Sequence, residues 1–357
     1  MAFAVAACSF DSAGVGSGDG TSGSATTGTS GSEASTLPTT STTVGTSSTD
    51  ATLTGVDATT EPDTSTSGAG TSSSSGASSD DESSSSGESG GGPPTFGPFD
   101  DAVPVAELNS EFFDDDPTLR GDLLEIYFAS LRGGGVGGEE IWRAERNSVA
   151  EDWGDPEIMS GLNSIGQDGW PELSHDGLWL SFGSDRFGGE GSFDIYVVGR
   201  ADFDSPWSLP FRVDELSSFD PEASAVMSAD MLEVMLASPI PTGDDILRAT
   251  RDDVLAPFGA LTPVDELNTN GRDTVPFIDL LGTRVLFASD RMGDMAIWTA
   301  TRELGMAFDE PEQVLDLDEP GRQEDDPWWA PDGSVIYFAR ESLAGDLDIY
   351  VAHQSAP

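Results

Sequence analysis

The chain has 357 residues, of which 65 are acidic and 15 are basic, and its formal net charge is −50 at pH 7. Every basic residue is an arginine. This balance argues against binding to nucleic acid or to an anionic membrane surface, because phosphate contacts need clustered basic side chains. It suits a basic protein partner, metal cations or a salty environment, or it serves solubility alone.

Residues 1–8 read MAFAVAAC, and Cys8 is the only cysteine, so no disulfide can form within the chain. Val5-Ala6-Ala7-Cys8 resembles the lipobox of bacterial lipoproteins. The resemblance implies lipidation of Cys8 and attachment to the cell envelope, on the periplasmic side or at the surface. The apolar run is shorter than an ordinary signal peptide and has no basic segment before it. Either the true start lies upstream, or the match is chance.

Residues 9–100 form the next segment, and its composition predicts a disordered acidic linker. Serine, threonine and glycine fill 55 of the 80 positions from 11 to 90. Such a segment has too few large apolar side chains to offset the entropy lost on ordering. Residues 101–357 carry all eight tryptophans and all four tyrosines, and they are numerous enough to bury one sizeable core. We therefore expect a single folded domain over 101–357.

Two residue types recur along this domain with one period of about 50 residues. A proline recurs at Pro117, Pro171, Pro221, Pro276 and Pro327, and a leucine recurs upstream at Leu108, Leu162, Leu216, Leu267 and Leu317. Each unit contains the same series: a short strand after the proline, a tight turn, an apolar strand, a loop, a third strand and a fourth strand ending at the leucine. The turns include His175-Asp176-Gly177 and Pro331-Asp332-Gly333, which suit hairpins.

Four short antiparallel strands repeated five times predict an all-β fold, a five-bladed β-propeller. The domain begins with an isolated fourth strand at 104–108 and ends after a third strand at 348–352. We expect the N-terminal strand to complete the last blade, because this pairing closes the ring and removes an exposed sheet edge.

The repeat resembles the WD-repeat-like β-propeller repeat of TolB-type periplasmic proteins over about 103–353. The matching residues are WPELSHDG and GSDRFGGEGSFDIYVV in the second unit, ASDRMGDMAIW in the fourth, and WWAPDGSVIYFARES with DIYVA in the fifth. The resemblance is specific for the repeat and does not identify the ligand. From the repeat, the tether and the lack of catalytic residues, we expect a rigid, monomeric, non-catalytic platform that binds a protein or another ligand.

Acidic residues stand three positions before the recurring proline in four units, at Asp114, Asp168, Asp273 and Glu324. One interpretation is a ring of carboxylates at the channel mouth that receives a basic partner or binds Ca²⁺ through oxygen ligands. The other is structural, with each side chain capping its turn by accepting backbone N–H hydrogen bonds.

Two further sets of residues have a functional and a structural interpretation. Trp170, Trp328 and Trp329 flank the same loops, where they could hold a partner or stack on a sugar, or pack between sheets. Arg132, Arg186 and Arg291 recur after the second strand, and we expect them to pair with neighbouring carboxylates between blades.

Most enzyme classes lack the residues they need. Gly87-Glu88-Ser89-Gly90-Gly91 fits a hydrolase nucleophile motif but lies in the predicted linker, and His175 and His353 have no plausible serine partner. Two histidines and one cysteine do not suit a zinc site. A five-bladed furanosidase-type glycoside hydrolase with paired carboxylates is the enzyme alternative. The sequence favours a non-enzyme that needs no cofactor, unless calcium binds.

Overall fold

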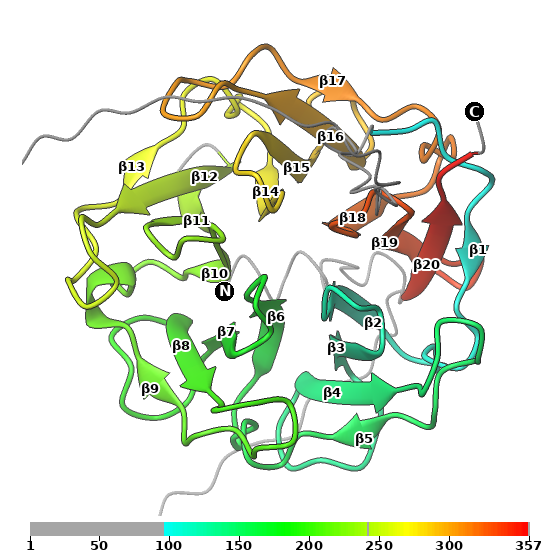
Figure 1. Cartoon of the computed structure of the whole chain (residues 1–357), viewed down its shortest axis with the longest axis horizontal. Coiled ribbons are helices and arrows are strands. Elements are labelled where there is room, and N and C mark those ends of the chain that lie inside the picture. The colour runs from blue at the N-terminus through cyan, green and yellow to red at the C-terminus, as the bar shows by residue number, and fades with distance from the viewer. Residues whose placement is uncertain (1–95, 241–242, 356–357) are drawn as a thin grey trace, which may run out of the picture. The chain divides into compact units, whose positions relative to one another are not determined.

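The computed structural model describes residues 96–240 and 243–355, and the strands in these ranges form five four-stranded antiparallel sheets around a central axis (Figure 1). The predicted five-bladed β-propeller is confirmed. Blade I contains β2 (Asp114–Leu119), β3 (Glu125–Ser130), β4 (Glu140–Glu145) and β5 (Glu157–Ile158). Blade II contains β6 (Asp168–Leu173), β7 (Trp179–Ser184), β8 (Asp194–Gly199) and β9 (Phe211–Arg212).

The remaining blades repeat this order from the axis outward. Blade III contains β10 (Ala223–Met227), β11 (Glu233–Ile240), β12 (Gly243–Thr250) and β13 (Thr262–Pro263). Blade IV contains β14 (Asp273–Ile278), β15 (Arg284–Ser289), β16 (Ala296–Thr301) and β17 (Glu312–Gln313). Blade V contains β18 (Glu324–Trp329), β19 (Val335–Glu341), β20 (Leu347–His353) and β1 (Val103–Pro104). The helix among the described residues is one 3₁₀ turn, Asp214–Leu216, and no described helix could cross a membrane.

The ring closes as predicted, because β1 pairs with β20 in antiparallel register, Val103 opposite Val351 and Pro104 opposite Tyr350. The predicted strand 104–108 is, however, too long. After Pro104 the chain turns, and the Leu108 amide donates to the carbonyl of Val105 at 3.0 Å. The turn carries the recurring leucine into the core, where Leu108 is fully buried. The other blades repeat this arrangement, so each fourth strand has only two residues.

The propeller begins earlier than residue 101. Phe96 packs edge-to-face on Phe99 and on Trp329, with ring centroids 5.2 Å apart in both pairs. Phe99 forms a β-bridge with Gln354. Residues 96–100 therefore belong to the folded domain, because their aromatic rings cover blade V. The predicted signal segment with Cys8, and the rest of the predicted linker, lie outside the described residues.

Each innermost strand is irregular at the same place, and this irregularity shapes the axis. The register with the second strand shifts near the start of the innermost strand, for example between Asp115 and Thr118 in β2 and between Ala223 and Val226 in β10. The residue there has a left-handed backbone in every blade: Asp116, Trp170, Ser224, Val275 and Asp326, with φ between 43° and 53°. Non-glycine residues seldom adopt this conformation, which costs on the order of 1 kcal/mol or more and is often found at functional sites.

One end of the axis is filled by aromatic side chains. Nε2 of His175, in the turn after β6, lies 3.1 Å from the carbonyl oxygen of Ile278 in blade IV, across the axis. The His175 ring packs on Phe277, and Phe277 packs on Trp328, with centroids 6.2 Å apart in each pair. We call this end the closed face. The opposite end carries the loops that enter the innermost strands and those that join β3 to β4, β7 to β8, β15 to β16 and β19 to β20, and we call it the channel face.

Candidate functional site

The four acids singled out from the sequence are the first residues of innermost strands, not loop residues, and all four are buried. In blade II, Oδ2 of Asp168 accepts a hydrogen bond from the Ser164 amide at 2.5 Å, and Oδ1 accepts one from the Ser184 hydroxyl at 2.5 Å. Asp114 and Asp273 repeat this arrangement. These are the capping hydrogen bonds of the structural interpretation.

Arginine completes each of these networks. Arg186 donates to Oδ1 of Asp168 at 2.5 Å and to the carbonyl of Leu162, in the preceding blade, at 2.6 Å. Arg132 and Arg291 do the same with Asp114 and Asp273, and Arg340 does so with Glu324. The expected arginine–carboxylate pairs are therefore present, although each carboxylate lies in the arginine's own blade. The bridge between blades is the bond to the leucine carbonyl.

Blade III shows what happens without the arginine. Glu222 occupies the same place, and its carboxylate accepts hydrogen bonds from the amide and hydroxyl of Ser218. No ion pair is found for it among the described residues. Burial raises the pKa of Glu222 to about 7 despite these hydrogen bonds. Burial also raises the pKa of Glu324 to about 7 although Arg340 pairs with it, so burial outweighs the arginine at that position.

The three candidate tryptophans lie in two different environments. Trp328 and Trp329 are buried, with Trp328 packed on Phe277 and Tyr337 and Trp329 on Phe96, which favours the interpretation that they pack between sheets. Their large rings fill the space between blades. Trp170 is also buried, with its ring edge-to-face on Phe193, but it lines a cavity on the axis.

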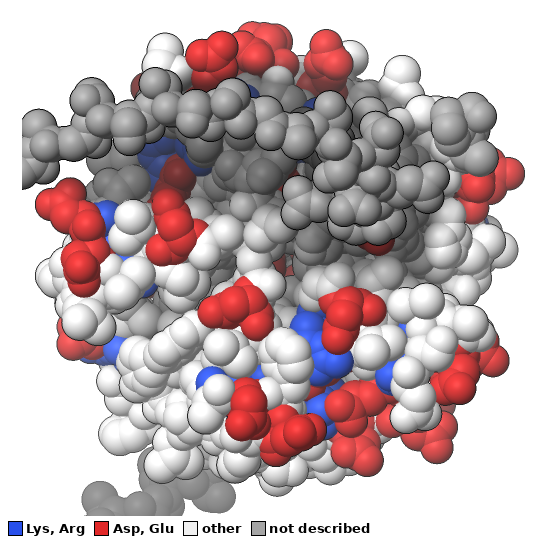
Figure 2. All heavy atoms as spheres, in the orientation of Figure 1, with Lys and Arg blue, Asp and Glu red and all other residues white. Residues whose placement is uncertain are grey.

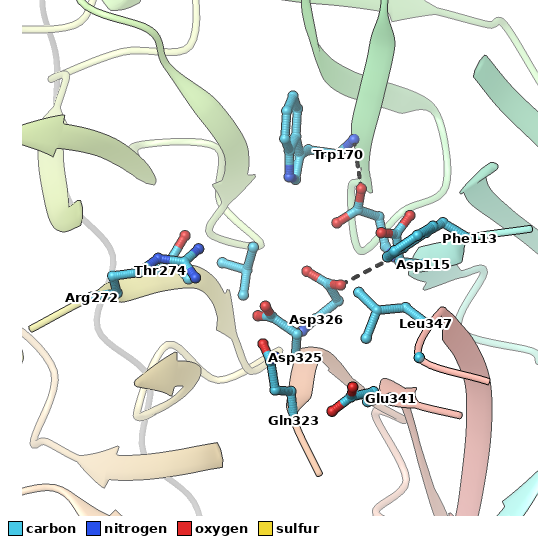
Figure 3. A pocket seen from close by; sticks show the side chains of 13 residues that line it. Phe113, Asp115, Trp170, Arg272, Thr274, Gln323, Asp325, Asp326, Glu341 and Leu347 are labelled. Atoms are coloured by element: carbon cyan, nitrogen blue, oxygen red, sulfur yellow. Dashed lines mark hydrogen bonds between the residues drawn. The ribbon is translucent and has the colours of Figure 1, made fainter. Parts of the chain in front are cut away.

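This central cavity has a volume of about 40 Å³, enough for a few water molecules, and lies below the channel face (Figure 3). Five carboxyl groups line it: Asp115 and Asp116 from β2, Asp325 and Asp326 from β18, and Glu341 at the end of β19. Of the described residues that line it, only Arg272 is basic, and its Nε donates to Asp244 at 2.8 Å. Phe113, Trp170, Val275 and Leu347 supply apolar wall.

Two of these carboxyl groups, those of Asp116 and Asp326, lie against each other. The Asp116 amide donates to Oδ2 of Asp326 at 3.4 Å, and the two carboxyl groups repel each other when ionised. Oδ2 of Asp116 also accepts from the Trp170 amide at 3.0 Å. Burial, followed by repulsion from neighbouring carboxylates, raises the pKa of Asp116 well above its usual value. The same causes raise the pKa of Asp115 and of Asp325.

Two glutamates extend this acidic cluster. Burial and the nearby Asp326 raise the pKa of Glu139, which precedes β4, to about 7. Burial raises the pKa of Glu172, in β6, to about 8, although Oε1 of Glu172 accepts a hydrogen bond from Ser224 at 3.1 Å. The axis thus holds more acidic groups than it can keep ionised without another cation.

Two oxygens at the cavity have no hydrogen-bond partner. They are Oδ1 of Asp115 and Oγ1 of Thr274, and both residues are at least 96% buried. Buried oxygens without a partner are uncommon and call for an explanation. Among the described residues, no group of three or more His, Cys, Asp or Glu side chains is placed to hold a metal ion.

Exposed apolar side chains surround the cavity on the channel face. We call them the apolar rim: Val136, Ile165, Phe187, Phe219, Met292 and Leu343, between 74% and 102% exposed. Neighbouring loops of the rim touch, since the Gly138 amide donates to the Gly166 carbonyl at 3.1 Å. A methyl group on Gly191 would lie 2.6 Å from the Ser218 carbonyl oxygen, so only glycine permits that contact. Leu255 and Leu304 are also exposed, but on the closed face, where His175 blocks the axis.

Three larger clefts, of about 620 to 680 Å³, lie between blades toward the closed face. In the cleft between blades I and II, Arg143 and Arg200 pair with the buried Glu125 at 2.7 and 2.6 Å. Arg302 pairs with Glu233 at the junction of blades III and IV in the same way. We interpret these recurring pairs as links between blades.

No family model and no curated protein sequence matches the chain. It is similar in structure to TolB from Acinetobacter baumannii, with 16% identity, a TM-score of 0.41 and coverage of 70% of this chain and 57% of that one. A family 117 glycoside hydrolase from Zobellia galactanivorans matches with 14% identity, a TM-score of 0.51 and coverage of 72% and 90%. An endo-arabinase from Bacteroides thetaiotaomicron matches with 12% identity, a TM-score of 0.48 and coverage of 71% and 97%.

The chain spans little more than half the length of the Acinetobacter TolB. At these identities the similarities show the propeller fold alone.

Proposed function

We propose that this chain is a non-catalytic β-propeller that binds a partner protein through its channel face. The apolar rim is the observation that carries the proposal. Phe187, Phe219 and Ile165 project almost fully into solvent on loops that surround the only end of the axis not blocked by His175. Exposed apolar groups gathered around a cavity are typical of interaction sites.

The charge of the chain indicates the chemistry of the partner. On the face in Figure 2, acidic side chains are spread around the ring with few arginines between them. With a formal net charge of −50, the chain attracts basic proteins and repels acidic ones. A basic partner with exposed apolar residues fits both features.

The geometry supports binding better than glycoside hydrolysis. A hydrolase needs two carboxyl groups about 5 to 9.5 Å apart on either side of a sugar. Here Asp326 accepts a hydrogen bond from the Asp116 amide at 3.4 Å, so these two acids lie against each other. The cavity of about 40 Å³ is also far smaller than a ligand pocket of roughly 300 Å³ or more.

A selection of random displayed peptides on the immobilised full chain tests the proposal. We expect peptides with apolar and basic residues, and we expect the double variant F187S/F219S to lose them. The control is L255S, a similar apolar-to-serine change at an exposed site on the closed face. If F187S/F219S still binds the selected peptides and L255S does not, the binding site lies on the closed face and the proposal is refuted.

We further propose, from the sequence alone, that Cys8 is lipidated and anchors the chain to a bacterial cell envelope, with residues 9–95 as tether. Incorporation of labelled fatty acid in a bacterial host, from a gene with its full upstream reading frame, checks this. The label is expected on the wild-type chain and absent from C8S, and label on both would contradict it.

A further inference from the structure

Resting on the proposed partner binding, we infer that the central cavity is a binding site for one alkylammonium group, supplied by a lysine side chain of the partner protein. The site is the cavity lined by Asp115, Asp116, Asp325, Asp326 and Thr274. We call it the lysine site.

Unmatched charge is the first argument. Five carboxyl groups line the cavity, whereas Arg272, the basic residue among the described lining, already donates to Asp244. The Asp116 amide donates to Asp326, so these two acids lie against each other, and burial followed by repulsion from Asp326 raises the pKa of Asp116. A cation entering the cavity would offset this repulsion and favour the ionised form of both groups.

The second argument is that the cavity wall carries buried hydrogen-bond acceptors without a partner. One of them is the hydroxyl oxygen of Thr274, which is not part of the acidic cluster. An ammonium group has three N–H donors and no acceptor. Oγ1 of Thr274 and Oδ1 of Asp115 are buried acceptors without a partner on the wall of the same cavity. In Figure 3, Thr274 lies on the opposite side of the cavity from Asp115, with Asp326 between them. An ammonium group placed against either oxygen would give it a hydrogen-bond donor.

The volume of the cavity and its apolar lining favour a lysine side chain over an arginine side chain. The cavity of about 40 Å³ accommodates a compact ammonium group, while the planar guanidinium of arginine needs a wider fork of acceptors. Phe113, Trp170 and Leu347 offer apolar surface to the methylene groups of a lysine stem. An aromatic ring beside the site adds attraction for a cation.

Access fits a side chain that arrives from the channel face. Gln323 and Gly345, which line the cavity, lie in channel-face loops, and His175 blocks the other end of the axis. A metal ion is a weaker candidate, because no group of three or more acidic, histidine or cysteine side chains in the described residues is placed to hold one.

The acidic cluster makes the binding pH-dependent. Glu139 and Glu172 have pKa values raised to about 7 and about 8 by burial, so lowering the pH protonates the cluster. An alkylammonium group keeps its proton up to about pH 10. Ammonium binding is therefore expected to strengthen as the pH rises from about 5 to about 8.5.

Thermal unfolding of the full chain with n-butylammonium chloride as the probe tests the site. At about 100 mM probe and pH of about 8.5, we expect the Tm to rise by about 3 °C above that in tetramethylammonium chloride at the same concentration. The rise should vanish at pH of about 5. D326N and T274V should each lose the rise, because T274V keeps the shape of the side chain and removes the acceptor. D294N, a matched change at an exposed acid on the channel face, should keep it.

Three results would overturn the assignment. Equal Tm rises with both ammonium salts would show a general salt effect. A rise with calcium chloride but not with butylammonium would make the cavity a metal site. No rise with either, at any pH, would mean that the cavity binds no cation.

The peptide selection separates this inference from the proposed function. Selected peptides should contain lysine on the wild-type chain and lose that preference on D326N. Peptides that need the apolar rim but show no lysine preference would leave the proposed function standing and refute the lysine site. Peptides insensitive to F187S/F219S would refute the proposed function instead.

Discussion

The ion pair between Arg186 and Asp168 provides the sharpest test of how the blades are held together. Arg186→Met keeps most of the aliphatic length and removes the guanidinium. Asp168, with no exposed surface, would keep its bonds from Ser164 and Ser184 but lose its cation, and the Leu162 carbonyl would lose a donor. Removing one partner of a buried pair costs about 3–5 kcal/mol.

The partial exposure of Arg186, 16% of its side chain, places the expected loss at the lower end, about 3 kcal/mol. For a domain of this size, that corresponds to a fall in Tm of roughly 10 °C. Denaturant unfolding of the full chain gives the free energy directly.

The double variant D168N/R186M is the control for this prediction. Because it removes the buried charge together with its partner, it should be more stable than R186M alone. A loss below about 1 kcal/mol in R186M would mean that the pair behaves like an exposed one. A double variant less stable than R186M would show that the buried carboxylate does not need its arginine. Either result would refute the reasoning.

Two further predictions concern the axis and the closure of the ring. Burial raises the pKa of Glu172 from 4.5 to about 8, so the folded chain holds a proton that the unfolded chain releases above pH 4.5. The free energy of unfolding of the wild type should therefore fall as the pH rises from 4.5 to about 8. Glu172→Gln should make this fall less steep and should be more stable than the wild type at pH 8, on the order of a few kcal/mol. Equal slopes of stability against pH in the two proteins would contradict the prediction. A chain beginning at Ser110 lacks β1 and the buried Leu108. It should melt at least about 10 °C below a chain beginning at Phe96, or it should aggregate through the uncovered edge of β20. Equal melting temperatures of the two chains would show that β1 does not close the ring.

The blades could be predicted because each repeat must bury the same residues. The recurring leucine is fully or almost fully buried in all five units, as Leu108 and Leu216 illustrate, so its spacing reports the period of the fold. The closure of the ring followed from the spare strand and the missing strand. The lengths of the fourth strands could not be predicted, because the residues before the leucine suit a strand and a turn equally well.

The central site could not be predicted because consecutive acids have different surroundings. Asp114, Asp115 and Asp116 form a run, and only the first pairs with Arg132. The register shift in β2 and the left-handed backbone of Asp116 turn the next two toward the axis. The one available signal was that a second and third acid occur in the first and fifth units alone, at 115–116 and 325–326.

The most direct test of the account is to map a selected peptide on the full chain by NMR, using the indole N–H signals of the tryptophans and the methyl signals of threonine and isoleucine. The account predicts shifts of Trp170, Thr274 and Ile165, together on the channel face, with no shift of Trp207 in the cleft between blades I and II. Shifts of Trp207 with Trp170 and Thr274 unchanged would place the partner in that cleft and contradict the central claim.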